Sequence, residues 1–191
     1  MKASNILVIM TDELRRDTLG CYGNTYVKTP HIDKLAKGGI RFDNAYTPSP
    51  ICVPARASIA TGKYVHEHHC WSNAIPYSGQ INSWHHILRA SGHRTTSIGK
   101  LHFRSDKDDN GFTEEIKPLH VKDGKGWIHG LLRERTDLFD ASGFAKNIGP
   151  GEDPYTQYDR NVCELTLKWL KDRSKNPDPK GWAGFVSFLR P

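Results

Sequence analysis

Long apolar runs are missing from this 191-residue sequence. The most apolar stretch near its start, Ile6–Met10, is far shorter than the roughly 20 residues that a membrane-spanning helix needs. It is also too short for the apolar centre of a secretory signal peptide. With a mean hydropathy of −0.62, the composition predicts a water-soluble, cytoplasmic protein that has no membrane segment.

Cysteine is scarce, and its spacing is irregular. The four cysteines are Cys21, Cys52, Cys70 and Cys163, and no two of them form a Cys-x-x-Cys pair. This spacing argues against a zinc finger, and a disulfide framework is typical of short secreted chains. We therefore expect reduced cysteines. The ten histidines include a group at 66–69, but their spacing is not that of a metal finger.

Motifs for binding nucleic acid are also absent from the sequence. The chain carries a net charge of +6 and has a pI near 9.1, and such a charge attracts anionic partners of any kind. Its basic residues are not interleaved with aromatic residues, as they are in many RNA-binding surfaces. The charge therefore predicts a small anionic substrate and no nucleic acid.

What the sequence does contain is an alternation of strand-like and helix-like segments. Apolar runs rich in β-branched residues predict strands at 5–10, 40–46, 94–98 and 182–189. Capped helical patterns lie at 29–36, 54–61, 83–90 and 153–169. The continuous run at 5–10 is typical of a central parallel strand that is buried on both faces. This order predicts one α/β domain whose mainly parallel central sheet is flanked by helices.

The stretch around Cys52 combines several features of an anion site. Pro54 suits the first turn of a helix, which places Cys52 in the loop at the helix N-terminus. Free N–H groups and the helix dipole favour negative charge there. Arg56 lies one turn after Cys52 on the same face, and its guanidinium can bind two oxygens of a tetrahedral oxyanion. The alternative is a small buried cysteine beside a helix start.

Two carboxylates follow the first predicted strand. Asp12 and Glu13 come at its carboxyl end, the edge at which open α/β sheets bind ligands. Adjacent carboxylate oxygens suit Ca²⁺ or Mg²⁺. Asp12 is equally suited to cap a helix over 13–19. The spacing alone predicts either a divalent-metal site or a helix cap.

A second polar group follows the predicted strand at 94–98. On an extended segment, Lys100 and His102 would point the same way. A lysine ammonium can neutralise an anionic oxygen, and a histidine can carry a proton near neutral pH. The alternative is a pair of solvated residues after a strand.

No clear periodicity is present over residues 116–151. Within this stretch, Trp127, His129 and Phe139 are candidates for the wall of a substrate pocket. We assign them no chemical role.

Together, these segments resemble the sulfatase family. The specific motif is Cys-x-Pro-x-Arg, here 52–56, followed by Thr61-Gly62. The run from Asn5 to Asp12 and the element Gly99-Lys100-Leu101-His102 also look like sulfatase segments. The resemblance implies an alkaline-phosphatase-like fold. It also implies that residues 1–191 are the N-terminal part of a sulfatase catalytic domain that is truncated here, because family members continue after the terminal Arg-Pro.

The resemblance further implies hydrolysis of a small sulfate ester. In sulfatases, a formylglycine-generating enzyme oxidises the motif cysteine to an aldehyde, and the hydrated aldehyde supplies the nucleophile. The implied catalytic residues are Cys52, Arg56, Lys100 and His102. The implied ligands of a divalent metal, expected to be Ca²⁺ with Mg²⁺ or Mn²⁺ as alternatives, are Asp12, Glu13 and the modified Cys52. Glu13 departs from the Asp-Asp pair that many members have.

Sulfate binding is implied for Lys100 and Asn73. The segment Asn73-Ala74 resembles a sulfate-contacting segment of choline-sulfatase-like members, but the match is short, and a turn-forming asparagine is the alternative. Three alternatives to sulfate hydrolysis stay open. They are a phosphonate monoester or phosphodiester hydrolase with the same motif, a non-catalytic truncated fragment, and a thiol hydrolase that uses unmodified Cys52. The alcohol part of the substrate and the oligomeric state are not predicted.

Overall fold

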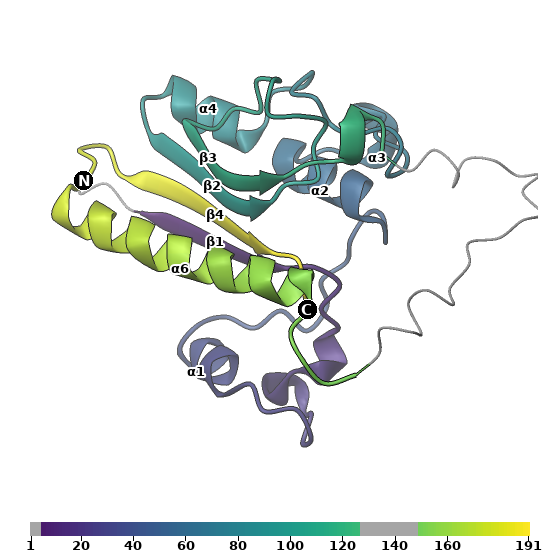
Figure 1. Ribbon diagram of the computed structural model, residues 1–191, viewed down its shortest axis with the longest axis vertical. Coiled ribbons are helices and arrows are strands. Elements are labelled where there is room, and N and C mark those ends of the chain that lie inside the picture. Colours follow the sequence, from purple (N-terminus) through teal and green to yellow (C-terminus); the bar gives the residue numbers. More distant parts are fainter. Residues whose placement is uncertain (1–4, 127–148) are drawn as a thin grey trace, which may run out of the picture.

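The predicted α/β architecture is confirmed by the computed structural model, which describes residues 5–126 and 149–191. Figure 1 shows a twisted sheet with helices packed on both of its faces. The three candidates for the pocket wall, Trp127, His129 and Phe139, lie outside the described residues.

The sheet has four described strands in the spatial order β1-β4-β2-β3. Their bounds are Ile6–Thr11 for β1, Arg94–Lys100 for β2, Glu114–Leu119 for β3 and Trp182–Phe188 for β4. All three pairings between these strands are parallel. The carboxyl ends of the strands therefore meet at one edge of the sheet.

Helices cover this sheet from two sides. Their bounds are Pro30–Gly38 for α1, Cys52–Thr61 for α2, Val65–His68 for α3, Trp84–Ala90 for α4 and Pro154–Lys175 for α6. Short 3-10 turns lie at Arg16–Thr18, Gly20–Tyr22 and Lys122–Gly124. Figure 1 shows α6 lying along one face, with α2 and α4 behind the sheet. In the described part of the chain, no helix has both the length and the apolar character needed to cross a membrane.

Two apolar clusters hold these layers together. Val53 and Ala57 of α2 belong to the same cluster as Phe185 of β4. On the other face, Val162 and Trp169 of α6 cluster with strand residues that include Ile98. Burying one large apolar side chain contributes about 1.5–3 kcal/mol, so the two clusters fix the positions of α2 and α6 against the strand ends.

The first strand is parallel, but the prediction that it is central and buried on both faces is wrong. Among the described strands, β1 lies at the edge, and β4 occupies the centre instead. Ile6 and Ile9 of β1 are 50% and 61% exposed. The apolar run therefore predicted the strand and its direction correctly, but not its place in the sheet.

One further predicted strand is absent from the described residues, and one observed strand was not predicted. Residues 40–46 form no strand, and Phe42 within them is 68% exposed. Conversely, β3 was not predicted, because Glu114–Leu119 is largely polar and contains Pro118. Its pairing with β2 sets its extended form, and an edge position tolerates the proline.

Candidate active site

Cys52 is the first residue of α2, and Ile51 before it has an extended backbone with φ −121°. The helix thus begins at Cys52 itself, two residues before the predicted start, and Pro54 lies in its first turn. No side chain at the N-cap of α2 accepts a hydrogen bond. Instead, Asn73 Oδ1 accepts one from the Val53 N–H at 3.0 Å. A remote residue thereby satisfies a free N–H at the helix start.

Asp12, directly after β1, contacts the other three residues of the candidate site described below. It is buried, and its Oδ1 accepts a hydrogen bond from Arg56 Nη2 at 3.0 Å. Its Oδ2 accepts one from Lys100 Nζ and lies 3.6 Å from Cys52 Sγ. We call Asp12, Cys52, Arg56 and Lys100 the charged cluster. The alternative of a helix cap is wrong, because the first helical turn begins at Arg16.

The charged cluster determines the protonation of its own members. Burial alone would raise the pKa of Asp12, but Lys100 and Arg56 outweigh it and hold this pKa below the usual 3.8. Burial raises the pKa of the Cys52 thiol, and together with the charge on Asp12 it outweighs the opposing charges of Lys100 and Arg56. A protonated thiol is a poor nucleophile. The environment therefore argues against the thiol hydrolase.

Arg56 is 3% exposed, and both of its terminal nitrogens donate hydrogen bonds to protein oxygens. Its Nη1 donates to the Lys100 carbonyl at 2.6 Å and to Ser187 Oγ at 3.0 Å. Together with the bond from Nη2 to Asp12, the guanidinium links the ends of three strands, β1, β2 and β4. This geometry supports a role in holding the site together.

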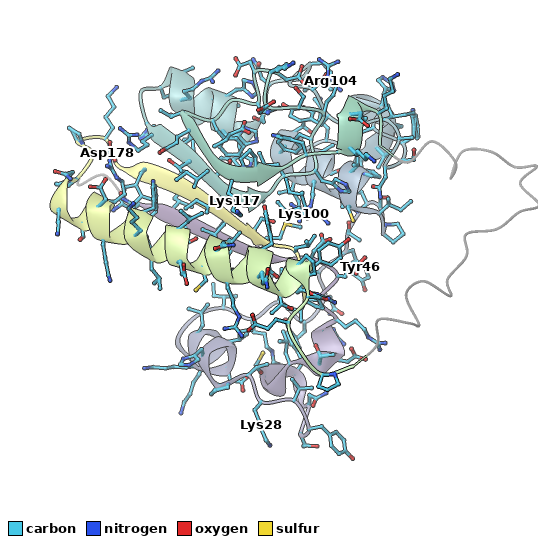
Figure 2. All side chains as sticks on the ribbon, viewed as in Figure 1. Lys28, Tyr46, Lys100, Arg104, Lys117 and Asp178 are labelled. Atoms are coloured by element: carbon cyan, nitrogen blue, oxygen red, sulfur yellow. The ribbon has the colours of Figure 1, made fainter. Side chains whose placement is uncertain are left out.

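Lys100 lies at an irregularity in the pairing of β2 with β3. The register between β2 and β3 shifts between Ile98 and Lys100, and Gly99 has φ +96°. A Cβ on Gly99 would lie 2.1 Å from the Ser187 carbonyl oxygen, so only glycine fits. Lys100 Nζ lies 3.9 Å from Cys52 Sγ. Figure 2 shows Lys100 at the carboxyl ends of the strands, far from Asp178 at the opposite end of the sheet.

His102 lies just beyond β2, and the prediction of an extended segment through it is wrong. The strand ends at Lys100, and His102 has φ +58°. Burial, followed by the charges of Lys100 and Arg56, lowers the pKa of His102 to about 4. The ring is therefore neutral at pH 7. Its Nδ1 is buried and has no hydrogen-bond partner among the described residues.

The residues that could hold a metal lie together. Asp12, Glu13 and Cys52 each offer a ligand atom, and these atoms lie within 4.8 Å of one another. Carboxylate oxygens fit a hard divalent cation, and an oxygen in place of the Cys52 sulfur would fit it as well. Ca²⁺ takes roughly six to eight oxygen ligands, so this set matches the chemistry of the cation but supplies only part of its shell.

Ser187 was missed by the sequence analysis. It is fully buried in β4, opposite Gly99 of β2, and its hydroxyl accepts a hydrogen bond from Arg56. The only signal in the sequence is a hydroxyl residue near the carboxyl end of an otherwise apolar strand. Nothing in that pattern predicts a contact with a residue that precedes it by more than a hundred positions.

The fold is an alkaline-phosphatase-like α/β domain, and the charged cluster lies at the carboxyl edge of its sheet. Comparison with known proteins gives the family, because the model of the sulfatase family matches residues 4–181. The chain belongs to the sulfatase family.

Relatives and solved structures agree with this assignment. A choline-sulfatase of Rhizobium meliloti is 31% identical over 98% of this chain, which covers 38% of that relative. An arylsulfatase of Clostridium perfringens is 36% identical over 88% of this chain, which covers 30% of that relative. The chain thus spans well under half the length of these relatives.

Two solved structures show the same fold. One is a protein in complex with its substrate D-glucosamine-2-N,6-O-disulfate, with a TM-score of 0.69, 27% identity, and coverage of 97% of this chain and 34% of the other. The second is a phosphonate monoester hydrolase of Agrobacterium radiobacter, with a TM-score of 0.67, 23% identity, and coverage of 98% and 41%. The second likeness concerns the fold alone.

Proposed function

We propose that residues 1–191 are the N-terminal part of a sulfatase catalytic domain whose Cys52, matured to formylglycine, hydrolyses a sulfate monoester. The observation that supports this most strongly is the convergence of Cys52, Asp12 and Lys100 from three separate segments of the chain. A nucleophile position, a carboxylate and a buried cation within hydrogen-bonding range are what the reaction of a bound anion requires.

The hydrated aldehyde carries two hydroxyls on one carbon. One hydroxyl oxygen forms a bond to sulfur while the bond from sulfur to the alcohol oxygen breaks, and the alcohol gains the proton that the attacking hydroxyl loses. The second hydroxyl then loses its proton, the carbonyl forms again, and the carbon–oxygen bond to sulfate breaks. Water adds to the aldehyde to restore the hydrate. A serine or cysteine ester would need a separate hydrolysis step.

The surrounding residues take distinct parts in this proposal. Lys100 binds a sulfate oxygen and offsets its charge, and Arg56 holds Asp12 and the hydrate in place. His102 is neutral at pH 7 because its pKa is lowered to about 4, so one of its ring nitrogens can accept the proton of the second hydroxyl. Asn73 caps the start of α2, and its amide nitrogen is the part that would reach sulfate.

Asp12, Glu13 and the matured Cys52 would hold a divalent cation, for which Ca²⁺ is our first choice. When bound, such a cation acidifies a hydroxyl and neutralises sulfate oxygens. The predicted consequence is that a chelator lowers turnover and that added Ca²⁺ restores it. Recovery with Mg²⁺ or Mn²⁺ alone would identify a different cation.

The substrate class is a small-molecule sulfate ester. Relatives are named for choline sulfate and aryl sulfates, and carbohydrate sulfates are a further candidate because a related structure holds a sulfated glucosamine. A phosphonate monoester hydrolase has the same fold, and hydrolysis of phosphonate monoesters or phosphodiesters is the alternative reaction that the Cys52 motif leaves open. Parallel assays with sulfate monoesters, phosphonate monoesters and phosphodiesters separate the two functions.

The deciding experiment is mass spectrometry of the peptide that contains Cys52, paired with turnover measurements. We expect the mass of an aldehyde, and we expect Cys52→Ala to abolish turnover. Cys163→Ala is the matched control, because Cys163 is a free, exposed cysteine in α6. Turnover that survives Cys52→Ala would disprove the nucleophile. Absence of any turnover from the matured protein would favour a non-catalytic fragment.

A further inference from the structure

Ser187 is a buried polar residue beside the charged cluster to which the proposed reaction gives no part. Its side chain is fully buried near the end of β4, the central strand that joins β1 to β2. Its Oγ lies 3.0 Å from Arg56 Nη1, which donates to it across 131 positions of sequence. Ser187 therefore makes a specific polar contact in the core and does not only fill space there.

The strand pattern explains why the hydroxyl faces Arg56. Side chains alternate between the two faces of a strand. Phe185 belongs to the cluster on the α2 side, and Val186 belongs to the cluster on the α6 side. Ser187 therefore returns to the α2 side, where Arg56 lies. An apolar residue at this position would leave the Nη1 of a buried guanidinium with the Lys100 carbonyl as its only acceptor among the described residues.

We propose that Ser187 is a positioning residue of the sulfatase site, which holds the Arg56 guanidinium in the orientation that fixes Asp12. Arg56 bonds to Asp12 through Nη2, and Asp12 contacts Cys52. Because a guanidinium is planar and rigid, fixing Nη1 also fixes Nη2. Ser187 thereby acts through Arg56 on the carboxylate that the reaction uses, without touching the substrate. This inference rests on the proposed function.

The chain offers a matched control for this contact. Ser97 is also fully buried, lies on the adjacent strand β2, and is paired in register with Phe185. Its Oγ has no hydrogen-bond partner among the described residues. Ser187→Ala and Ser97→Ala therefore make the same chemical change at the same depth, but only the first removes a bond to Arg56.

The test is steady-state kinetics of the matured protein with an aryl sulfate. For Ser187→Ala we expect kcat to fall about tenfold, which is the scale of one hydrogen bond to a charged group, while KM changes less than about twofold. Ser97→Ala should leave both parameters unchanged. Ser187→Thr, which keeps the hydroxyl, should recover most of kcat. Equal losses of kcat in the two alanine variants would overturn the proposal, because they would indicate a general packing effect.

A second measurement does not depend on turnover. NMR of the Arg56 side chain, assigned with an Arg56→Lys variant, reports how freely its guanidinium nitrogens rotate. We expect restricted rotation in the wild type and in Ser97→Ala, and faster rotation in Ser187→Ala. Unchanged rotation in Ser187→Ala would overturn the proposal whether or not the wild type is active. A wild type without sulfatase activity would instead count against the proposed function, so the two failures are distinguishable.

Discussion

The charged cluster and the segment 26–46 reverse the usual distribution of side chains. In the charged cluster, Asp12, Arg56 and Lys100 are each at least 94% buried. In the segment 26–46, the apolar side chains Leu35 and Ile40 are 74% and 83% exposed, and α1 contains no buried residue. Soluble proteins usually place these residue types the other way round.

The two regions differ in whether neighbouring residues compensate for the unusual placement of their side chains. Charges in the cluster are buried because each is paired with an opposite charge or a polar group. The segment 26–46 keeps a helix and several local hydrogen bonds, such as that from the Cys21 N–H to Asp33 Oδ1 at 2.7 Å, but the described residues do not cover its apolar side chains. Figure 2 places Lys100 among the strand ends and Lys28 at the far lower part of the molecule.

The largest expected effect comes from Asp12→Asn. This change leaves the buried cations Arg56 and Lys100 facing a neutral amide, and breaking a buried pair from one side costs about 3–5 kcal/mol. We expect turnover to be lost and the free energy of unfolding, measured with urea, to fall by that amount. Asp17→Asn is the control, because its pair with Arg15 is exposed. Equal unfolding midpoints for the two variants would mean that the buried pairing contributes no stability.

A smaller effect is expected from truncating apolar side chains in the two regions. Ile98 is 1% exposed within the cluster against α6, whereas Leu35 of α1 is 74% exposed. Ile98→Ala should lower the free energy of unfolding by about 2–5 kcal/mol, and Leu35→Ala should change it by less than about 0.5 kcal/mol. A large loss for Leu35→Ala would show that the segment 26–46 buries this side chain in solution.

Local pattern predicted the helices α2, α4 and α6, the helix α1 in the exposed segment 26–46, and the central strand β4. The capped helical pattern at 153–169 is confirmed by α6, where the Asp153 side chain accepts a hydrogen bond from the Thr156 N–H. The strand predicted at 40–46 failed because a strand needs a partner, and its apolar pattern contains no information about one.

For the candidate site, the sequence singled out residues that the fold brings together, but it did not predict how they are arranged. Asp12, Cys52 and Lys100 were singled out individually, because each follows a strand or starts a helix. Their mutual contacts depend on the spatial order of strands, which places β4 between β1 and β2. The contact of Ser187 and the need for glycine at position 99 were missed for the same reason, since both depend on the close approach of β4 to β2.

A third prediction concerns pH and uses a buried base outside the charged cluster. Burial, followed by the neighbouring His86, lowers the pKa of His85 to about 3, and its ring stacks on Phe112 with centroids 4.1 Å apart. The unfolded chain takes up this proton below pH about 6.5, and the folded protein does so only near pH 3. The stability that neutral His85 contributes is therefore complete above about pH 6.5 and is lost progressively as the pH falls toward 3.

The expected slope for His85 approaches about 1.4 kcal/mol per pH unit within that window. His102 adds to it down to about pH 4, because its pKa is lowered in the same direction. Urea unfolding between pH 4 and 6.5 checks this, with His85→Phe expected to reduce the slope by about one proton. Leu35→Ala, which changes an exposed residue that has no titratable group, supplies the control and should keep the wild-type slope. An unchanged slope in His85→Phe would contradict the assignment.

The smallest expected effect is at the start of α6. Asp153 accepts a hydrogen bond from the Thr156 N–H at 2.8 Å and pairs with Arg190. Asp153→Ala removes both contacts, and loss of a cap costs about 0.5–2 kcal/mol. Asp153→Asn keeps a capping oxygen and removes only an exposed ion pair, which is worth about 0–1 kcal/mol. Because α6 places Val162 and Trp169 in the core, the cost of Asp153→Ala should appear in global unfolding by urea. Equal losses in the two variants would show that the ion pair, and not the cap, stabilises this helix start.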